Sequence, residues 1–496
     1  MRIVLIMTDT QRTDMLGCYG NRDMRTPSLD RLAAEGVRFD RAYTCQPVCG
    51  PARSAIFTGT FPHSNQSWGN SMPLGANVKT LGQRLRDAGV PAAYIGKWHV
   101  DGGDYFGLGR APDGWDPEAW YDMRCYLEEL EPADRRDSRS FATMQRRGVT
   151  ADFTYAHRAS NRAISWLERH GGEPRFLLVL SYDEPHGPSV CPEPYASMYR
   201  DYVFPKSPNV WDSLAGKPEH QRVWAGDSLR VDKDALEIRA PALLGCNAFV
   251  DREIGRVLEA VERIAPDALV IYTSDHGDML WSHSLHGKGP VVYDEITRVP
   301  LIVRCPGMVP PGAVSPHPAS HIDLAPTIME ALGLPLPRLL EGKSMLRSFR
   351  DPSHRLNDVV HIEFSRYEID HDSFGGFQPL RAAFDGRYKL CVNLLTSDEL
   401  YDLEADPGEM TNLIASSEPE VRRVRDTLHD ELLDWMNRTR DPFRGYYWER
   451  RSWRSDAREA TWKHTGMTRQ RENEEYEPRQ LDYDTGLPMT EATRRK

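Results

Sequence analysis

Residues 1–9 read MRIVLIMTD, an unbroken apolar run from Ile3 to Met7 that is followed by Thr8 and the acidic Asp9. A short, continuous apolar run of this kind predicts a strand that is buried on both faces. Further runs of the same type lie along the chain, at Ala92–Ile95, Phe176–Ser181, Ala268–Thr273 and Leu301–Arg304.

Segments with helical periodicity lie between these strands. They are Pro27–Gly36, Lys79–Gly89, Tyr155–His170 and Leu243–Ile264. Strands that alternate with helices predict an α/β fold, in which a large, mostly parallel sheet is sandwiched by helices on both faces.

The pattern changes near residue 356, where shorter strands are predicted at Val359–Phe364, Arg381–Phe384 and Tyr388–Asn393, followed by a helix at Pro419–Asn437. This predicts a smaller C-terminal antiparallel sheet with a helix on it. We therefore divide the chain into residues 1–355, 356–445 and an extended C-terminal tail, 446–496. The tail is polar and rich in Arg and Trp, so it either packs on the body or a second subunit, or is partly disordered.

Two long stretches, residues 101–150 and 187–235, show little periodicity. Irregular insertions of this length are usually functional lids or disordered segments. The aromatic residues Trp115, Trp120 and Tyr121 could stack on a substrate ring. We favour the alternative that they pack a small core of the insertion itself.

Length and charge restrict the classes of protein. A chain of 496 residues with 40% hydrophobic residues can bury a large core and is expected to form two or more structural units. The net charge is -11, with acids and bases mixed along the chain, which argues against nucleic acid as a partner. An anionic substrate remains compatible, because a few local cations can outweigh the global field.

The cysteines and the apolar segments indicate the cellular compartment in which we expect the protein. The eight cysteines are sparse and form no framework of short spacings. No stretch has the length of a membrane span, and the N-terminal segment lacks the pattern of a signal peptide. We expect a cytoplasmic protein with reduced thiols and no membrane partner.

Polar clusters follow four of the apolar runs. Asp9 follows the first; the others are Lys97 with His99, Asp183 with Glu184 and His186, and Asp275 with His276. Sites in open parallel sheets form at the carboxyl ends of strands. One such residue alone would more often be structural, but four clusters together predict a single shared site.

Asp9, Asp275 and His276 suit a divalent cation, since they offer carboxylate oxygens and an imidazole nitrogen. The alternative is that the two aspartates cap the turns that follow them.

Cys49-Gly50-Pro51-Ala52-Arg53-Ser54 predicts a helix start, because proline is tolerated in the first turn of a helix. Cys49 would then lie at the helix N-terminus, where free N–H groups favour anions. Taken alone, this is a thiol with a depressed pKa or a buried cysteine.

The same stretch resembles the sulfatase signature Cys-x-Pro-x-Arg, and Cys45 does not fit because Cys49 stands where the arginine is required. Further matches to the sulfatase family follow in order over about residues 1–440. They are Asp9-Thr10-Gln11-Arg12, Gly96-Lys97-Trp98-His99, Thr273–Asp278, Gly287-Lys288-Gly289, Arg298–Leu301, Asp323–Thr327 and Glu399–Leu403. The resemblance implies an alkaline phosphatase-like fold with a mixed sheet in the first part of the chain.

Such a resemblance also implies a mechanism. A maturation enzyme would oxidise Cys49 to formylglycine, whose hydrate attacks sulfur with one hydroxyl and expels sulfate with the other. One divalent metal would be held by Asp9, the modified Cys49, Asp275 and His276. Calcium is the usual ion of the family, and the imidazole ligand leaves manganese as the alternative. The chain departs from many relatives at Thr10, where a second aspartate is common, and at His276, which is often asparagine.

Roles for the remaining site residues follow from the resemblance. Lys97 and Lys288 are expected to bind the sulfuryl and leaving oxygens, and Arg53 to orient the hydrate. His186 is expected to protonate the leaving oxygen and His99 to take a proton from the second hydroxyl, while Asn70 is a weaker candidate for substrate contact. The alternatives are that the two lysines are solvated surface charges, that Arg53 forms a salt bridge on the helix surface, and that His186 is an ordinary loop histidine. His283 and His286 are expected near the ligands rather than as ligands themselves, and His321, near Asp323, is expected at a structural helix start.

The predicted function is hydrolysis of a small-molecule sulfate monoester, with an aryl, alkyl or sugar alcohol. One alternative is a phosphonate monoester or phosphodiester hydrolase of the same superfamily, whose members share the Asp275-His276 pair but replace the Lys97-x-His99 pair. A second alternative is a non-catalytic relative that binds anionic esters with Cys49 unmodified. The expected protein partners are the maturation enzyme and a second copy of the chain, contacted through the tail.

Overall fold

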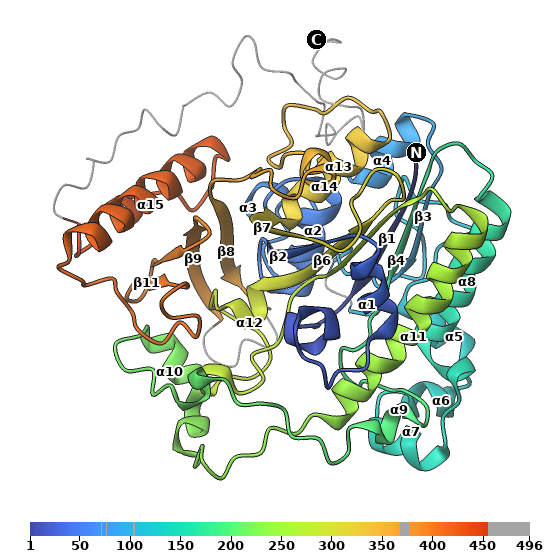
Figure 1. Ribbon diagram of the computed structural model, residues 1–496, viewed down its shortest axis with the longest axis horizontal. Helices are drawn as coiled ribbons and strands as arrows, with labels where there is room; N and C mark the ends of the chain where they lie inside the picture. The colour runs from blue at the N-terminus through green and yellow to red at the C-terminus, as the bar shows by residue number, and fades with distance from the viewer. Residues whose placement is uncertain (71, 76, 103–104, 368–375, 455–496) are drawn as a thin grey trace, which may run out of the picture.

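The computed structural model describes residues 1–70, 72–75, 77–102, 105–367 and 376–454. Within them the chain forms two sheets, one of seven strands and one of four (Figure 1). The larger sheet occupies the centre of the molecule, and the smaller sheet lies beside it with a long helix.

The strand order of the larger sheet is β3-β4-β1-β5-β6-β2-β7. The strands are β1 (Arg2–Thr8), β2 (Val37–Tyr43), β3 (Ala92–Gly96), β4 (Phe176–Ser181), β5 (Leu269–Ser274), β6 (Arg298–Arg304) and β7 (Ala313–Ser320). Only β6 runs antiparallel to its neighbours, β5 and β2, and the other pairs are parallel. The sheet is therefore mixed and mostly parallel, which confirms the predicted fold class.

Helices cover both faces of this sheet, as predicted. Val4 and Ile6 of β1 pack in the core shared with α1 (Pro27–Ala34), α8 (Tyr155–His170) and α11 (Pro241–Ile264). Ile3, Leu5 and Met7 pack on the other face, which is covered by α2 (Cys49–Thr58), α4 (Leu81–Asp87), α13 (Leu324–Ala331) and α14 (Leu346–Arg350). In Figure 1, α8 and α11 lie together on one side, and α13 and α14 on the other. Because helices shield both faces of the sheet from solvent, β1 is apolar at successive positions rather than at alternate ones.

Two strands of the large sheet were not predicted. In β2, charged Arg38, Asp40 and Arg41 interrupt the apolar pattern. In β7, Pro316 and Pro318 argue against a strand, but β7 is the edge of the sheet, where a missing N–H can face away from the ladder.

The smaller sheet has the order β11-β10-β9-β8 and is antiparallel throughout. Its strands are β8 (Val360–Arg366), β9 (Phe377–Phe384), β10 (Tyr388–Asn393) and β11 (Glu399–Asp402), and α15 (Pro419–Arg438) packs against it. The predicted antiparallel sheet with its helix is confirmed, with β11 as an additional strand. The division of the chain at residues 355 and 445 remains a prediction.

Residues 101–150 are more regular than expected. They contain α5 (Met123–Glu129), α6 (Pro132–Asp137) and α7 (Phe141–Arg147). The side chains of Asp122 and Ser140 cap α5 and α7 by accepting backbone N–H bonds. These helices are short, so they show little periodicity, and the capping residues are the signal in the sequence that marks where two of them begin.

The aromatic residues of this insertion do not form a core of their own, so that expectation is wrong. Trp115 and Trp120 are buried against Tyr94 in the middle of β3, with ring centroids 5.2 and 5.5 Å away. Tyr121 packs on the opposite face of the sheet, against Tyr155 of α8. All three side chains are therefore committed to the cores of the large sheet.

The second insertion and the start of the tail also pack on the body. Residues 187–235 contain α9 (Tyr195–Met198), α10 (Glu219–Ala225) and short 3-10 turns. In the described part of the tail, α16 (Tyr446–Glu449) buries Trp448, and Arg451 pairs with Asp398. The predictions for residues 455–496 lie outside the described residues.

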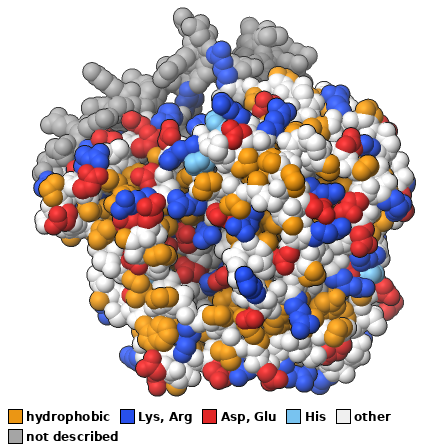
Figure 2. Space-filling model, in the orientation of Figure 1, with side chains coloured by type: hydrophobic (Ala, Val, Ile, Leu, Met, Phe, Trp, Pro, Cys, Tyr) orange, Lys and Arg blue, Asp and Glu red, His pale blue; other side chains and the backbone are white. Residues whose placement is uncertain are grey.

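The visible surface carries both signs of charge. On the face shown in Figure 2, Lys and Arg side chains are interspersed with Asp and Glu. All eight cysteines are described, and each is a free thiol. Among the described residues, no helix combines the length and the apolar character needed to cross a membrane.

Candidate active site

Four adjacent strands deliver the polar clusters to one edge of the large sheet. Asp9 directly follows β1, Lys97 follows β3, Asp275 follows β5, and Asp183 stands just beyond β4. These strands are neighbours in the order β3-β4-β1-β5 and run parallel, so their carboxyl ends meet. Gly96 makes the turn before Lys97 with a φ of 122°, where a Cβ would stand 1.9 Å from the Ser181 carbonyl oxygen.

Donors of the kind that bind metals converge at this edge. Ligand atoms of Asp9, Cys49, Asp275 and His276 all lie within 4.8 Å of one another, and all four residues are buried. Cys49 Sγ lies 3.1 Å from His276 Nε2 and 3.8 Å from Asp9 Oδ1. Cys49 is the first residue of α2, which confirms the predicted helix start.

Arg53 lies one helical turn beyond Cys49 and therefore on the same face of α2. It is fully buried and is not the surface salt bridge considered as an alternative. Its guanidinium donates to Asp275 Oδ2 at 3.0 Å and to Asp9 Oδ2 at 3.2 Å. It also donates to Ser181 Oγ at 2.6 Å and to the Lys97 carbonyl at 2.7 Å. A planar fork with several donors can hold both carboxylates at fixed positions.

Two ammonium groups border the Cys49 sulfur. Lys288 Nζ lies 2.7 Å from Cys49 Sγ and 2.8 Å from His276 Nε2. Lys97 Nζ lies 3.9 Å from the sulfur and forms ion pairs with Asp9 at 2.8 Å and Asp183 at 3.0 Å. Burial and Asp9 oppose ionisation of the Cys49 thiol, but Lys288 and Lys97 bring its pKa well below the usual value. The site therefore stabilises negative charge on the side chain of residue 49.

The two aspartates carry more negative charge than this dry site accommodates easily. Burial would raise the pKa of the Asp9 carboxyl, but Lys97 brings it well below the usual range. At Asp275, burial and the neighbouring Asp9 raise the pKa to about 7. A divalent cation would relieve the repulsion between the two carboxylates.

His276 is oriented as a metal ligand. Its Nδ1 lies 2.8 Å from the Gly277 carbonyl oxygen, which can only accept, so Nδ1 carries the proton. The lone pair of Nε2 then faces Cys49 and Lys288. A backbone carbonyl that fixes the tautomer of a ligand histidine is a common feature of metal sites. The donor set thus fits one divalent ion with mixed oxygen and nitrogen ligands.

Thr10 takes part in the site by orienting these ligands, which the sequence did not indicate. Its backbone has a φ of 63°, unusual for a β-branched residue. Its hydroxyl donates to Asp9 Oδ1 at 2.7 Å, and its N–H donates to Asp275 Oδ1 at 3.3 Å. The Thr10 hydroxyl therefore helps to fix the orientation of the Asp9 carboxylate.

The remaining predicted residues surround Cys49 less directly. His99 is buried with its imidazole beside Cys49, and burial lowers its pKa. Nδ1 of His99 has no hydrogen-bond partner among the residues that the structure describes. The Asn70 amide oxygen accepts from the Gly50 N–H at 2.9 Å, so it supports the start of α2. His186 is half-buried, with Nδ1 3.0 Å from the Tyr105 hydroxyl and 2.9 Å from the Gly187 carbonyl.

Three further histidines are bonded to groups outside the cluster. His283 Nδ1 lies 2.7 Å from Asp212 Oδ2 and its ring stacks on Tyr293. His286 is exposed and contacts Ser228. His321 Nε2 lies 3.0 Å from the Thr273 hydroxyl. None of the three belongs to a group of potential metal ligands among the residues that the structure describes.

A second buried group of donors consists of His63, Glu363 and Asp441. The imidazole of His63 is hydrogen-bonded to Glu363, and Arg381 donates to Asp441 at 2.6 and 3.1 Å. Because Arg381 already compensates these acids, we interpret the group as an ion network that joins α3 (Pro62–Asn65) to the small sheet.

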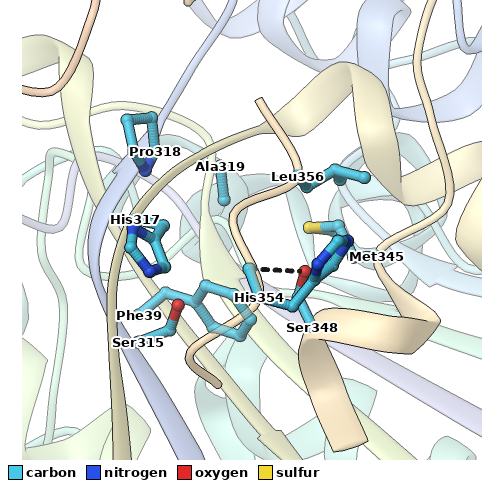
Figure 3. Close-up of a pocket in the computed structure, with 9 residues that line it drawn as sticks. All are labelled: Phe39, Ser315, His317, Pro318, Ala319, Met345, Ser348, His354 and Leu356. Carbon is cyan, nitrogen blue, oxygen red and sulfur yellow. Dashed lines mark hydrogen bonds between the residues drawn. The ribbon is translucent and has the colours of Figure 1, made fainter. Parts of the chain in front are cut away.

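A cavity away from the site is shown in Figure 3. It lies at the β7 edge of the large sheet, beside α14, and Ser348 Oγ donates across its wall to the His354 carbonyl at 3.2 Å. Its lining is Phe39, Ser315, His317, Pro318, Ala319, Met345, Ser348, His354 and Leu356. None of these is a candidate site residue.

Comparisons with known proteins identify the family to which the chain is similar. Residues 2–334 match the family described as Sulfatase, and residues 282–438 match "N-sulphoglucosamine sulphohydrolase, C-terminal". The uncharacterized sulfatase YidJ of Escherichia coli (strain K12) is 45% identical over 98% of this chain and 96% of its own length. An arylsulfatase of Clostridium perfringens is 28% identical over 85% of this chain and 91% of its own.

Among solved structures, the phosphonate monoester hydrolase of Agrobacterium radiobacter matches with a TM-score of 0.72. It is 25% identical to this chain, and the match covers 88% of this chain and 96% of that structure. The fold and these relatives define a hydrolase of the sulfuric ester class. The chain belongs to the sulfatase family, within the alkaline phosphatase superfamily.

Proposed function

We propose that this protein hydrolyses small-molecule sulfate monoesters, with residue 49 as the nucleophile after oxidation of Cys49 to formylglycine. The observation that carries the proposal is the pair of ammonium groups, Lys288 and Lys97, at 2.7 and 3.9 Å from the Cys49 sulfur. Compact cations placed where charge develops are the main means by which an enzyme stabilises such a transition state.

One divalent ion belongs to this proposal, held by Asp9, residue 49, Asp275 and His276. Calcium is our first choice because carboxylate oxygens dominate the donor set, and manganese is the alternative because of the imidazole. Formylglycine hydrate would supply a nucleophilic hydroxyl and a second hydroxyl to expel sulfate, and the ion would lower the pKa of the first.

The chain's own residues orient the ester and move its protons. Lys97 and Lys288 bind the sulfuryl oxygens and compensate charge on the leaving oxygen, while Arg53 holds Asp9 and Asp275 in place. His186 gives a proton to the leaving oxygen, and His99 accepts one from the side chain of residue 49. Asn70 keeps the role of a substrate contact through its position beside Gly50.

The second candidate function is hydrolysis of phosphonate monoesters or phosphodiesters. It is favoured by the Asp275-His276 pair, by Thr10 in place of a second aspartate, and by similarity to the Agrobacterium radiobacter hydrolase. The buried Lys97 with His99 favours sulfate instead, because the family resemblance implies uncharged hydroxyl residues in place of this pair in phosphonate-cleaving enzymes.

The deciding experiment compares kcat/KM for one aryl alcohol presented as a sulfate, a phosphate monoester, a phosphate diester and a phosphonate. We expect the sulfate to be the best substrate. A clear preference for the phosphonate or the diester would overturn the assignment and leave the fold and the nucleophile intact.

The alternative of a non-catalytic, anion-binding relative is tested by mass spectrometry of the tryptic peptide that contains Cys49. We expect the mass of formylglycine in protein made together with a maturation enzyme. An unmodified cysteine under those conditions, combined with ester binding and no turnover, would favour the non-catalytic alternative.

The maturation enzyme is thus the first partner that we propose. We also propose a cytoplasmic location, which the free state of all eight cysteines supports. A homo-oligomer formed through the C-terminal tail is a further proposal, and sedimentation of the full chain against a chain ending at residue 454 would test it.

A further inference from the structure

Tyr105 lies between Lys97 and His186, although it belongs to the first insertion and to none of the matched motifs. Its hydroxyl donates to Asp183 Oδ1 at 2.6 Å and lies 3.0 Å from His186 Nδ1. Its ring lies 4.2 Å from Lys97 Nζ, a cation–π contact, and stands edge-on to the His99 ring at 5.6 Å. One tyrosine therefore contacts three of the groups that surround the proposed reaction centre, and Asp183 as well.

The hydrogen-bond partners determine which nitrogen of His186 carries a proton. Asp183 pairs with Lys97, so its carboxylate is ionised and accepts the Tyr105 O–H. The Tyr105 oxygen is then an acceptor for His186. The Gly187 carbonyl, 2.9 Å from the same Nδ1, can also only accept. Nδ1 is therefore the protonated nitrogen, and Nε2 is the nitrogen left for chemistry.

Asp183, Tyr105 and His186 thus form a chain of hydrogen bonds that ends at an imidazole. A carboxylate that acts through a tyrosine oxygen on Nδ1–H fixes the ring and stabilises its protonated form. The arrangement is similar to a catalytic histidine that is oriented by a carboxylate, except that here the Tyr105 hydroxyl lies between the carboxylate and the imidazole.

We propose that Tyr105 is a positioning residue that holds His186 with Nε2 available to protonate the leaving oxygen of the ester. This inference rests on the proposed function. As the nucleophile at residue 49 bonds to sulfur, the bond from sulfur to the ester oxygen breaks and its electron pair stays on that oxygen. His186 acts in its charged form, which carries a proton on each ring nitrogen. The proton on Nε2 moves to the ester oxygen, which leaves a neutral alcohol and a neutral imidazole with its proton on Nδ1, and water then restores the proton to Nε2.

The proposal predicts an effect that depends on the leaving group. A phenol that is already acidic, such as 4-nitrophenol, leaves without a proton, whereas an alkyl alcohol needs one. Tyr105→Phe keeps the ring over Lys97 and removes only the hydroxyl. We expect kcat to fall by ~10- to 100-fold for an alkyl sulfate and by less than about 3-fold for 4-nitrophenyl sulfate, with KM little changed.

Two variants make the comparison specific. His186→Ala should show the same dependence on the leaving group, and adding Tyr105→Phe to it should cause little further loss, because both act through one proton transfer. Tyr202→Phe is the matched control, since the Tyr202 hydroxyl also faces a carboxylate, Asp23 at 3.5 Å, but its ring packs in a hydrophobic cluster with Met24 and Phe204 that contains no candidate site residue. It should leave both rates unchanged.

A readout besides activity comes from ¹⁵N NMR of histidine-labelled protein, with the His186 signal assigned by its loss in His186→Ala. We expect Nδ1 to carry a proton in the native protein both before and after Nε2 titrates, and we expect the Nδ1 signal to shift in Tyr105→Phe. An unchanged signal, equal losses for the two esters, or additive losses in the double variant would each overturn the positioning role. A native enzyme that hydrolyses neither sulfate would instead overturn the proposed function, so the two failures are distinguishable.

Discussion

Replacement of Lys97 by alanine removes the ammonium group that lies between Asp9 and Asp183, at 2.8 and 3.0 Å. Lys97 is 2% exposed, so its charge acts in a water-poor environment. We expect kcat/KM for an aryl sulfate to fall by about 100- to 1,000-fold, or ~3–4 kcal/mol, which is typical for loss of one preorganised donor.

The fold should tolerate this change. Without Lys97, Asp9 keeps its ion pair with Arg53 at 3.2 Å, and Asp183 keeps the Tyr105 hydroxyl at 2.6 Å. Neither carboxylate is left entirely unpaired, so the large penalty for an isolated buried charge is avoided. Loss of a positive charge beside Asp9 should also favour a bound divalent ion rather than weaken it.

The assay is steady-state hydrolysis of an aryl sulfate by matured enzyme, together with metal content and thermal unfolding of each variant. Lys97→Met separates charge from side-chain volume and should lose as much activity as Lys97→Ala. Lys206→Ala is the control, because Lys206 donates to the carbonyl oxygens of Lys233 and Asp234 and contacts the Trp211 ring, and none of these is a candidate site residue. A folded, metal-loaded Lys97→Ala that retains more than about a third of the native kcat/KM would refute the role of this charge.

Three further predictions concern the nucleophile, the metal and a buried acid. Cys49→Ser should fold but lose multiple turnover, because serine lacks the second hydroxyl that expels sulfate; sustained turnover near the native rate would contradict this. Elemental analysis of desalted protein should give about one divalent ion per chain, lost in an Asp275→Asn variant, and two tightly bound zinc ions would be the contrary result. Burial, and after it the neighbouring Asp183, raise the pKa of the Glu184 carboxyl to about 8 in the folded protein. Its pKa in the unfolded chain is about 4.3, so the contribution of the Glu184 carboxyl to stability is present at low pH and is lost as the pH rises through the pKa of the folded state. Glu184→Gln keeps the 2.9 Å bond from the Ala156 N–H and should flatten the fall in unfolding free energy between about pH 5 and pH 8, measured by denaturant titration, whereas the exposed Glu168→Gln should not.

Local pattern was enough to find the central strands and the elements that follow them. β4 and β10 have the predicted bounds, as does α8, and β1, β3 and β5 differ by one residue at one or both ends. These segments are buried on a whole face or on both faces, so their apolar positions follow directly from their geometry. An edge strand such as β7 has a neighbouring strand on one side alone, and which strand lies at the edge is decided when the whole sheet assembles.

The same contrast applies to the site. The cluster at Asp9, Lys97, Asp183 and Asp275 was predictable because polar residues that follow parallel strands share one edge. The contact of Lys288 with Cys49 spans 239 positions of sequence, and that of Tyr105 with Asp183 spans 78. In the sequence, Lys288 is indicated only by the match of Gly287-Lys288-Gly289 to the sulfatase family, and no local pattern indicates Tyr105.

By itself the sequence determined the class of fold, the strand ends that carry chemistry, and residue 49 as the candidate nucleophile. The fold class and the strand ends follow from periodicity and from neighbours within a few positions, which a single chain displays directly, and residue 49 follows from its resemblance to the sulfatase signature. The tertiary structure decided the spatial order β3-β4-β1-β5, the orientation of Thr10 toward Asp9, and the contacts of Tyr105 with Asp183 and His186. Those features arise when distant segments pack, because hydrogen-bond partners and ion pairs are selected by the space that the folded core leaves between them.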